Sequence, residues 1–253
     1  MELRAIRRCL SQSYRLDPYL VALSERVPSH RFLGGATQGC YGRQVALLRA
    51  YVESMGQRPA DVRVLDWGTG KGHISYLLRQ EGFQVTGCDV DQPTEDSTFG
   101  QATPLLSEHP VPVVPLDHPW RLPFDDAAFD VVVSFGVLEH VPDDAQSLCE
   151  IRRVLKARGF FFFSFLPYWL SWTQRVAHLR GDRYHERLYR KRDVDRLAAD
   201  AGFEVEAMWH GQLLPKNSLR HSDTRERVDR WLTWYTPLRY LATNLEGFLR
   251  VRV

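Results

Sequence analysis

The chain has 253 residues, of which 44% are hydrophobic and 25% charged, and its formal net charge is +2. This composition is typical of a globular protein, and the near-neutral charge disfavours nucleic acid as a partner. The four cysteines include no CxxC pair and have no metal-ligand spacing, so neither a disulfide framework nor a metal site is predicted.

Membrane and secretion signals are not evident in the sequence. No apolar run approaches the ~18 residues that cross a bilayer, and the N-terminal stretch MELRAIRRCL lacks the apolar core of a signal peptide. We therefore expect a cytoplasmic protein.

Residues 1–60 are predicted to form a mostly helical N-terminal lead-in. Leucines recur at helical spacing in residues 16–27, and residues 43–56 have the pattern of a second helix. Between them, residues 30–42 (HRFLGGATQGCYG) are interpreted as a glycine-rich loop.

From residue 62 onwards, apolar runs alternate with helical segments. The run FDVVVSF (129–135) indicates a central strand, whereas Pro112 and Pro115 cannot donate ladder hydrogen bonds and place their strand at a sheet edge. This alternation predicts an α/β fold with a doubly wound, mostly parallel sheet. The predicted strands are 62–67, 83–89, 111–116, 129–135, 159–166, 203–209 and 244–253, and the helices are 73–82, 143–156 and 193–202.

Two segments interrupt the alternation, at residues 168–192 and 210–243. The first contains seven basic and two acidic residues, and we interpret it either as a solvated helical face or as a lid that meets an anionic group. In the second, apolar residues share a helical face that could pack on the core, form a homodimer surface, or rest on a membrane through residues 225–241. These apolar residues are Val228, Trp231, Leu232 and Tyr235.

The loop after the first strand, in VRVLDWGTGKG, is the strongest functional signal. A dinucleotide site would require GxGxxG, but His73 occupies the third glycine position. The spacing found here suits a ligand with a charged amino-acid tail, whose carboxylate binds N–H groups at the helix start while Asp66 holds its ammonium. Asp89, at the end of the second strand, is placed to accept both hydroxyls of a ribose. The ligand implied is S-adenosylmethionine.

With these residues the chain resembles the class I S-adenosylmethionine-dependent methyltransferases, and in particular the branch that acts on quinones, sterols, lipids and sugars. Five blocks over about residues 60–209 carry the resemblance: VLDWGTGKG, VTGCDVD, LDHPWRLPFDDAAFDVVVSFGVLEHV, EIRRVLKARGFFFFSF and LAADAGFEV. It implies a seven-stranded sheet ordered 3-2-1-4-5-7-6 with strand seven antiparallel. The methyltransferase domain would be residues 61–253, with residues 1–60 covering the cofactor site and 168–192 and 210–243 as acceptor lids.

The resemblance also implies the residues around the cofactor. Asp117 or His118 would form a hydrogen bond with the adenine amino group, although both could instead cap their loop. The segment from Phe135 to Glu139 would pass beside the sulfonium. The full predicted cofactor-binding set is Asp66, Trp67, Gly68, Gly70, Asp89, Val90, Asp117, His118 and Phe135.

The function predicted is methyl transfer to oxygen of a small-molecule, lipid-linked or carbohydrate acceptor that carries an anionic group, with S-adenosylhomocysteine as the product. A hydroxyl acceptor needs a general base, and His140 is the predicted catalytic residue, with local structural support as its alternative role. His178 and His185 lie on the insertion expected to cover the acceptor. Two alternatives remain open: an S-adenosylmethionine-binding regulator or scaffold without turnover, and an NAD-dependent enzyme, which the missing glycine disfavours. A homodimer and peripheral contact with the inner membrane face also remain open.

Overall fold

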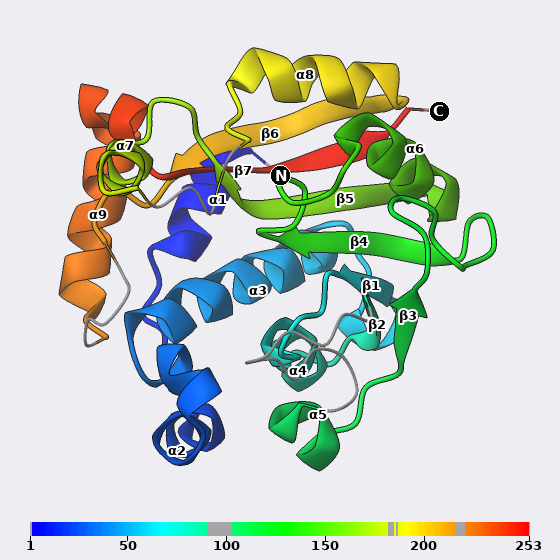
Figure 1. Ribbon diagram of the computed structural model, residues 1–253, viewed down its shortest axis with the longest axis horizontal. Coiled ribbons are helices and arrows are strands. Elements are labelled where there is room, and N and C mark those ends of the chain that lie inside the picture. The colour runs from blue at the N-terminus through cyan, green and yellow to red at the C-terminus, as the bar shows by residue number, and fades with distance from the viewer. Residues whose placement is uncertain (1, 91–102, 182–184, 186, 216–220, 253) are drawn as a thin grey trace.

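The computed structural model describes residues 2–90, 103–181, 185, 187–215 and 221–252. Within these residues the chain forms a seven-stranded sheet in the order β3-β2-β1-β4-β5-β7-β6, shown in Figure 1. Neighbouring strands from β3 to β5 pair in parallel, and β7 is antiparallel to both β5 and β6. The predicted fold class is therefore confirmed. The strands are β1 Arg63–Trp67, β2 Gln84–Val90, β3 Val113–Leu116, β4 Phe129–Phe135, β5 Leu155–Pro167, β6 Phe203–Gly211 and β7 Asn244–Val251.

Helices cover both faces of this sheet. Alternate side chains along β4 point to opposite faces: Val131 and Val133 belong to one apolar cluster, and Val132 to another. The first cluster is completed by α1, α3 and α4, and the second by α6 and α8, which lie on the opposite side of the sheet in Figure 1. The helices are α1 Leu3–Leu10, α2 Pro18–Arg26, α3 Ala36–Ser54, α4 His73–Gln80, α5 Pro104–Glu108, α6 Asp144–Val154, α7 Trp172–Leu179, α8 Lys191–Asp200 and α9 Asp223–Tyr235, with 3-10 turns η1 Pro28–Gly34, η2 Pro59–Asp61 and η4 Pro237–Leu241.

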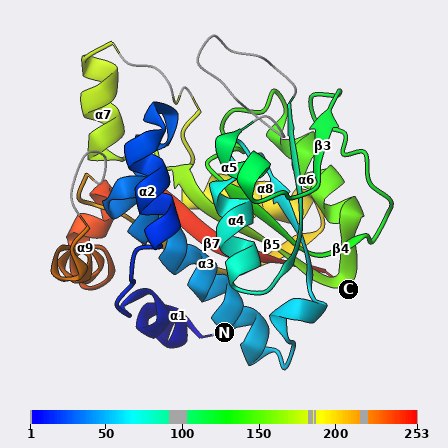
Figure 2. The ribbon, with the colours of Figure 1, turned by 90° about the horizontal axis from the view of Figure 1, so that it is seen from below.

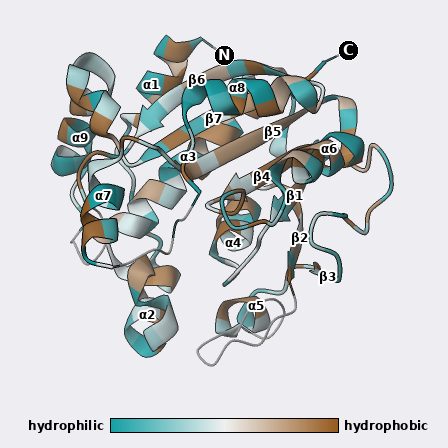
Figure 3. Cartoon of the chain, turned by 45° about the horizontal axis from the view of Figure 1, so that its top comes forward, coloured by the Kyte–Doolittle hydropathy of each residue, from teal (hydrophilic) through white to brown (hydrophobic). Residues whose placement is uncertain are grey.

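The strand positions follow from local sequence. In β3, Pro115 lies opposite Asp89 of β2, and β3 occupies the sheet edge, as the prolines predicted. The phenylalanines of β5 bury their rings on alternating faces, and Figure 3 shows this strand in the hydrophobic colour at the centre of the molecule. The result is a sheet whose central strands β4 and β5 are largely buried.

The glycine-rich segment 30–42 is not a loop, which corrects the sequence prediction. It forms η1 and the first two turns of α3. Gly39 and Gly42 are tolerated in this helix because other groups occupy the space of a side chain: a Cβ on Gly42 would overlap the Tyr14 ring, and one on Gly39 would lie 2.7 Å from His221 Nδ1. Close tertiary packing therefore overrides the weak helix propensity of glycine.

The helix α9 in the second insertion packs on the core through Trp234, whereas the apolar face predicted from the sequence is not buried. Its apolar face is turned to solvent: Val228, Trp231 and Tyr235 are 46%, 57% and 64% exposed. The buried face includes Glu226, because the buried Arg43 of α3 pairs with that carboxylate. Figure 2 shows α2, α7 and α9 on one side of the molecule. In the described part of the chain, none of the helices combines the length and apolar character needed to cross a bilayer.

Candidate functional site

The loop between β1 and α4 is built on three glycines with left-handed backbones. Gly68, Gly70 and Gly72 have φ of +79°, +53° and +82°, a region that L side chains seldom adopt. The N–H groups of Gly68 and Thr69 both donate to the Cys88 carbonyl, at 2.9 and 3.1 Å. These bonds fold the loop back onto the end of β2 and turn the start of α4 towards the same edge of the sheet.

Asp89 joins this loop to the end of β2. Its Oδ2 accepts a hydrogen bond from Gly70 N at 2.5 Å and its Oδ1 accepts one from Val90 N at 2.7 Å. Burial raises the pKa of this half-buried carboxylate. Each carboxylate oxygen has a further lone pair, so the group can still accept hydrogen bonds from two ligand hydroxyls. The Val90 side chain beside it is 47% exposed and offers an apolar contact.

Asp66 is the buried acid of the site. It is 1% exposed, and its Oδ2 accepts a hydrogen bond from the Ser75 hydroxyl at 2.6 Å. Burial is the main cause that raises the pKa of Asp66 to about 7. An ammonium group at this position would favour the ionised carboxylate, so the residues present fit a ligand with a positively charged amino group.

The other predicted residues near β1 and β3 differ in their burial and in the groups that they contact. The Trp67 side chain is buried in the core, 6.5 Å from the Phe161 ring, so only its backbone faces the loop. His118 Nδ1 accepts hydrogen bonds from the N–H groups of Arg121 and Trp120, at 3.1 and 3.4 Å, and so caps its own loop. Asp117 is exposed just beyond the end of β3.

Aromatic rings gather at the end of β4, where Phe135 lies. Its ring is 6.2 Å from Tyr41 of α3 and 6.0 Å from Phe165 of β5. The Tyr41 ring is in turn 4.6 Å from His73 at the start of α4. Phe165 has φ +62°, an uncommon backbone for a bulky residue, at a register shift in β5. Tyr41 and Phe165 are not among the residues predicted from the sequence, because nothing in their local patterns marks them as parts of a site.

The turn after β4 carries Glu139 and the predicted catalytic residue His140. Glu139 is 6% exposed, and burial raises its pKa to about 8. His140 Nε2 lies 3.9 Å from Glu139 Oε1, and burial lowers the pKa of His140, which keeps its ring neutral at pH 7. His185, from the first insertion, places Nδ1 3.7 Å from the same oxygen. The sequence pointed to His140 and to His185, but not to their meeting at Glu139.

Several basic residues of the insertion 168–192 hold protein groups. Arg187 donates to the carbonyls of Val141 at 2.9 Å and Pro142 at 3.2 Å, so it fastens the turn after β4. Arg190 lies 3.9 Å from the centre of the Trp169 ring. The helix α7 lies in the same insertion and has no fully buried residue, and residues 182–184 and 186 lie outside the described residues.

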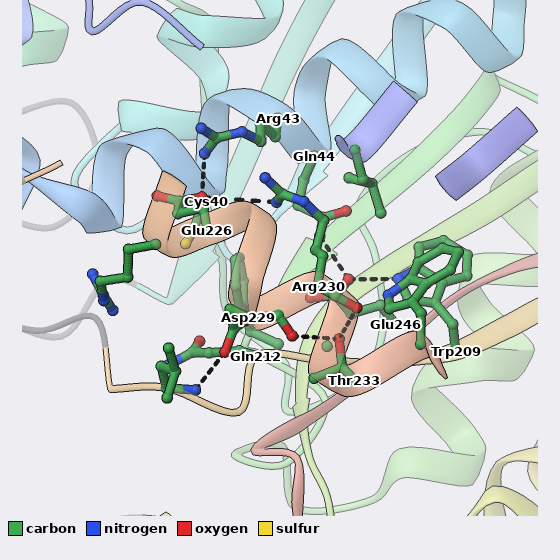
Figure 4. Close-up of a pocket in the computed structure, with 16 residues that line it drawn as sticks. Cys40, Arg43, Gln44, Trp209, Gln212, Glu226, Asp229, Arg230, Thr233 and Glu246 are labelled. Atoms are coloured by element: carbon green, nitrogen blue, oxygen red, sulfur yellow. Dashed lines mark hydrogen bonds and ion pairs between the residues drawn. The ribbon is translucent and has the colours of Figure 1, made fainter. Parts of the chain in front are cut away.

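A polar cavity of about 50 Å³ lies between α3, α9 and the adjoining ends of β6 and β7 (Figure 4). Phe165, Arg230 and Glu246 are among the residues that line it. Glu246 Oε2 accepts hydrogen bonds from Gln44 Nε2 at 2.6 Å and Trp209 Nε1 at 2.7 Å. Because Phe165 belongs both to this cavity and to the aromatic cluster at Phe135, the cavity adjoins the end of β4.

The predicted residues therefore meet at one edge of the sheet. They lie at or just beyond the carboxyl ends of β3, β2, β1 and β4, which are neighbours in that order. Ligands of open α/β sheets bind at this edge. The arrangement offers a loop for an anion, two carboxylates of different burial and a neutral imidazole.

The sequence matches a family model described as a methyltransferase domain, over residues 41–208. A probable S-adenosylmethionine-dependent methyltransferase of Mycolicibacterium smegmatis is 29% identical over 177 residues, which are 67% of this chain and 63% of the relative. A ubiquinone biosynthesis O-methyltransferase of Idiomarina loihiensis is 28% identical over 151 residues, or 56% of this chain and 61% of the relative. The chain thus spans about three fifths of the length of these curated relatives.

A solved structure shares the fold. Burkholderia thailandensis 1,6-didemethyltoxoflavin-N1-methyltransferase, with bound 1,6-didemethyltoxoflavin and S-adenosylhomocysteine, matches with a TM-score of 0.53 and 20% identity. The match covers 96% of this chain and 93% of that chain. At this identity the likeness concerns the fold alone.

Proposed function

The chain belongs to the class I S-adenosylmethionine-dependent methyltransferases, and on that premise we propose that it methylates a hydroxyl oxygen of a small-molecule acceptor. The observation that carries the proposal is the neighbouring position of two groups at the sheet edge. The glycine loop closed on Asp89 suits the methyl donor, and the turn with His140, after the adjacent strand of the sheet, suits a base for the acceptor.

The donor-binding residues in this proposal follow from their chemistry. Asp66 pairs with the ammonium, N–H groups at the start of α4 meet the carboxylate, and Asp89 accepts the ribose hydroxyls. Because His118 caps its own loop, Asp117 is the better candidate for the adenine amino group. Val90 and Phe135 contribute apolar contacts. S-adenosylmethionine supplies a methyl carbon bonded to a positively charged sulfur. The sulfur–carbon bond breaks and leaves its electron pair on sulfur as the new carbon–oxygen bond forms.

His140 is the proposed acceptor of the hydroxyl proton. Its lowered pKa keeps the imidazole neutral near pH 7, which is the form able to take a proton. Glu139, 3.9 Å away, would favour the imidazolium only in its ionised form, and burial raises the pKa of that carboxyl to about 8. Transfer to oxygen is supported by this base, since a neutral amine acceptor has a free lone pair and does not require one.

The polar cavity beside Phe165 is the proposed entry for part of the acceptor. Among the described residues, Arg230 Nε and Nη2, Glu226 Oε1 and Gln44 Oε1 have no hydrogen-bond partner. Hydroxyl groups both donate and accept, so they can satisfy the guanidinium and the two oxygens together. This supports a polyhydroxylated, carbohydrate-like acceptor over one recognised by net negative charge, because acidic side chains accompany the arginines.

For the exposed face of α9 we propose contact with a membrane that carries a lipid-linked acceptor. Trp231 and Tyr235 of α9 and Tyr240 of the following turn η4 are 57%, 64% and 49% exposed, and such amphipathic rings suit a headgroup region. Sedimentation with lipid vesicles should retain the wild type and release the Trp231→Ser, Tyr235→Ser variant. If the protein stays in solution and light scattering shows a dimer that these substitutions dissociate, the face is instead a homodimer surface.

Turnover is tested with S-adenosylmethionine that carries a labelled methyl group and a panel of hydroxylated acceptors with their amine analogues. We expect label in the hydroxylated compounds and formation of S-adenosylhomocysteine. His140→Ala should lower kcat by about 10²-fold or more while cofactor affinity stays unchanged. His109→Ala, whose ring packs on Tyr19, is the matched control.

Two results would count against this function. Full activity of His140→Ala would remove His140 from the role of base. Tight S-adenosylmethionine binding without product on any acceptor would favour a scaffold or regulator that has no turnover.

For the cavity, Arg230→Lys should raise KM for the acceptor, whereas the exposed Arg227→Lys on the same helix should not.

A further inference from the structure

Three metal-ligating side chains meet beside the turn after β4: Glu139, His140 and His185. One ligand atom from each lies within 4.8 Å of the other two. Glu139 Oε1 is 3.9 Å from His140 Nε2 and 3.7 Å from His185 Nδ1. Two ligands of one tetrahedral cation at ~2.1 Å lie ~3.4 Å apart, so the carboxylate stands a few tenths of an ångström beyond that separation from both imidazoles.

The Glu139 carboxylate lacks the partners that a buried acid requires. Its side chain is 1% exposed, and among the described residues neither of its oxygens has a hydrogen-bond partner. Removing a carboxylate from water costs free energy unless a cation or a set of donors meets it. The imidazole nitrogens are too far away to donate hydrogen bonds at these separations. A cation between the three groups would fill that gap.

The surrounding structure holds the two segments of this cluster together. Glu139 and His140 lie in a turn closed by the hydrogen bond from His140 N to the Val137 carbonyl, at 2.9 Å. The segment that carries His185 is tied to the same turn by Arg187, and by Tyr189, whose hydroxyl donates to the Leu138 carbonyl at 3.2 Å. The backbone carbonyl of His185 also lies 3.0 Å from His178 Nε2. Residues distant in the sequence are thus fixed around one point.

We propose that Glu139, His140 and His185 bind one divalent transition-metal cation, with coordination positions left open towards the acceptor. One carboxylate and two imidazoles suit Zn²⁺, Co²⁺ or Fe²⁺, and they disfavour Mg²⁺, which prefers oxygen ligands. The cation site extends the proposed function. Its catalytic consequence rests on that function, whereas cation binding itself does not. In that setting a cation lowers the pKa of a bound hydroxyl, the task that His140 performs as a base in the metal-free protein.

Cation binding is measured without turnover. The full chain is treated with chelator, dialysed and titrated with Zn²⁺ by calorimetry and with Co²⁺ by visible absorption. We expect one equivalent of either cation to bind, and the melting temperature to rise with added Zn²⁺. Glu139→Gln should weaken binding at least tenfold and abolish the thermal shift. Glu150→Gln, at a partly buried acid of α6 that is paired with Arg153, should behave as wild type.

The outcomes separate this inference from the proposed function. Absence of Zn²⁺ and Co²⁺ binding by the wild type, or equal affinity in Glu139→Gln and wild type, would overturn the cation site and leave the methyltransferase proposal intact. If Glu139→Gln does not fold, His185→Ala serves in its place, because His185 is only partly buried. S-adenosylhomocysteine binding by the same samples reports on the donor site alone. Turnover that persists in chelator would show that His140 acts directly as the base.

Discussion

The buried carboxyl of Asp66 makes a pH dependence of cofactor binding the sharpest prediction. Its ordinary pKa is 3.8, and burial raises it to about 7 in the free protein. Below pH 7 the free protein therefore holds a proton on Asp66, which must leave when an ammonium group binds. The affinity for S-adenosylhomocysteine is expected to fall by about tenfold for each pH unit below 7, or about 100-fold between pH 7 and pH 5.

The assay is calorimetry between pH 5 and pH 7. An α-amino group has an ordinary pKa of about 7.7–8.0, so the ligand stays an ammonium throughout that range. Asp66→Asn should bind weakly and without pH dependence, whereas the exposed Asp61→Asn should keep the wild-type profile. A flat wild-type profile, or tight binding by Asp66→Asn at pH 7, would refute the ammonium assignment.

The same pKa shift has a consequence for stability. A folded-state pKa raised above the unfolded value gives stability that is complete below pH 3.8 and is lost as the pH rises to about 7. Without cofactor at pH 8, Asp66→Asn is therefore expected to melt at a higher temperature than the wild type. A lower melting temperature would show that the ionised carboxylate has a favourable partner in the free protein.

Three further substitutions test other parts of the structure. Asp89→Ala should weaken S-adenosylhomocysteine binding by about 1.5–3 kcal/mol in calorimetry, the range for hydrogen bonds that involve a charged group; unchanged affinity would remove the ribose assignment. Arg187→Met should lower kcat at constant cofactor affinity and reduce the free energy of unfolding by about 1–3 kcal/mol, whereas the exposed Arg192→Met should do neither. Gly42→Ala should destabilise the protein by about 1–3 kcal/mol in denaturant titration, because the new methyl group meets the Tyr14 ring; wild-type stability would mean that this ring moves aside freely.

Local patterns in the sequence were sufficient for most strands of the sheet and for the glycine loop that follows β1. Strand periodicity, the prolines of β3 and the glycine loop each depend on residues within a few positions of one another. The resemblance then supplied the strand order, which the structure confirms. Asp89 could be placed from its spacing after the glycines, because the end of β2 must lie beside the end of β1 in a parallel pair.

Tertiary structure decided the features that depend on distant segments. The helical start of α3 requires Tyr14 and His221 to occupy the space beside its glycines, and the polar face of α9 is buried because Arg43 meets it. His185 reaches Glu139 only because the insertion folds back on the turn after β4. Sequence periodicity reports how a segment partitions between water and a core, whereas the partner of a buried charge is set by packing between segments. The sequence by itself therefore determined the fold and the methyl donor, and the packing determined which side chains meet at the end of β4.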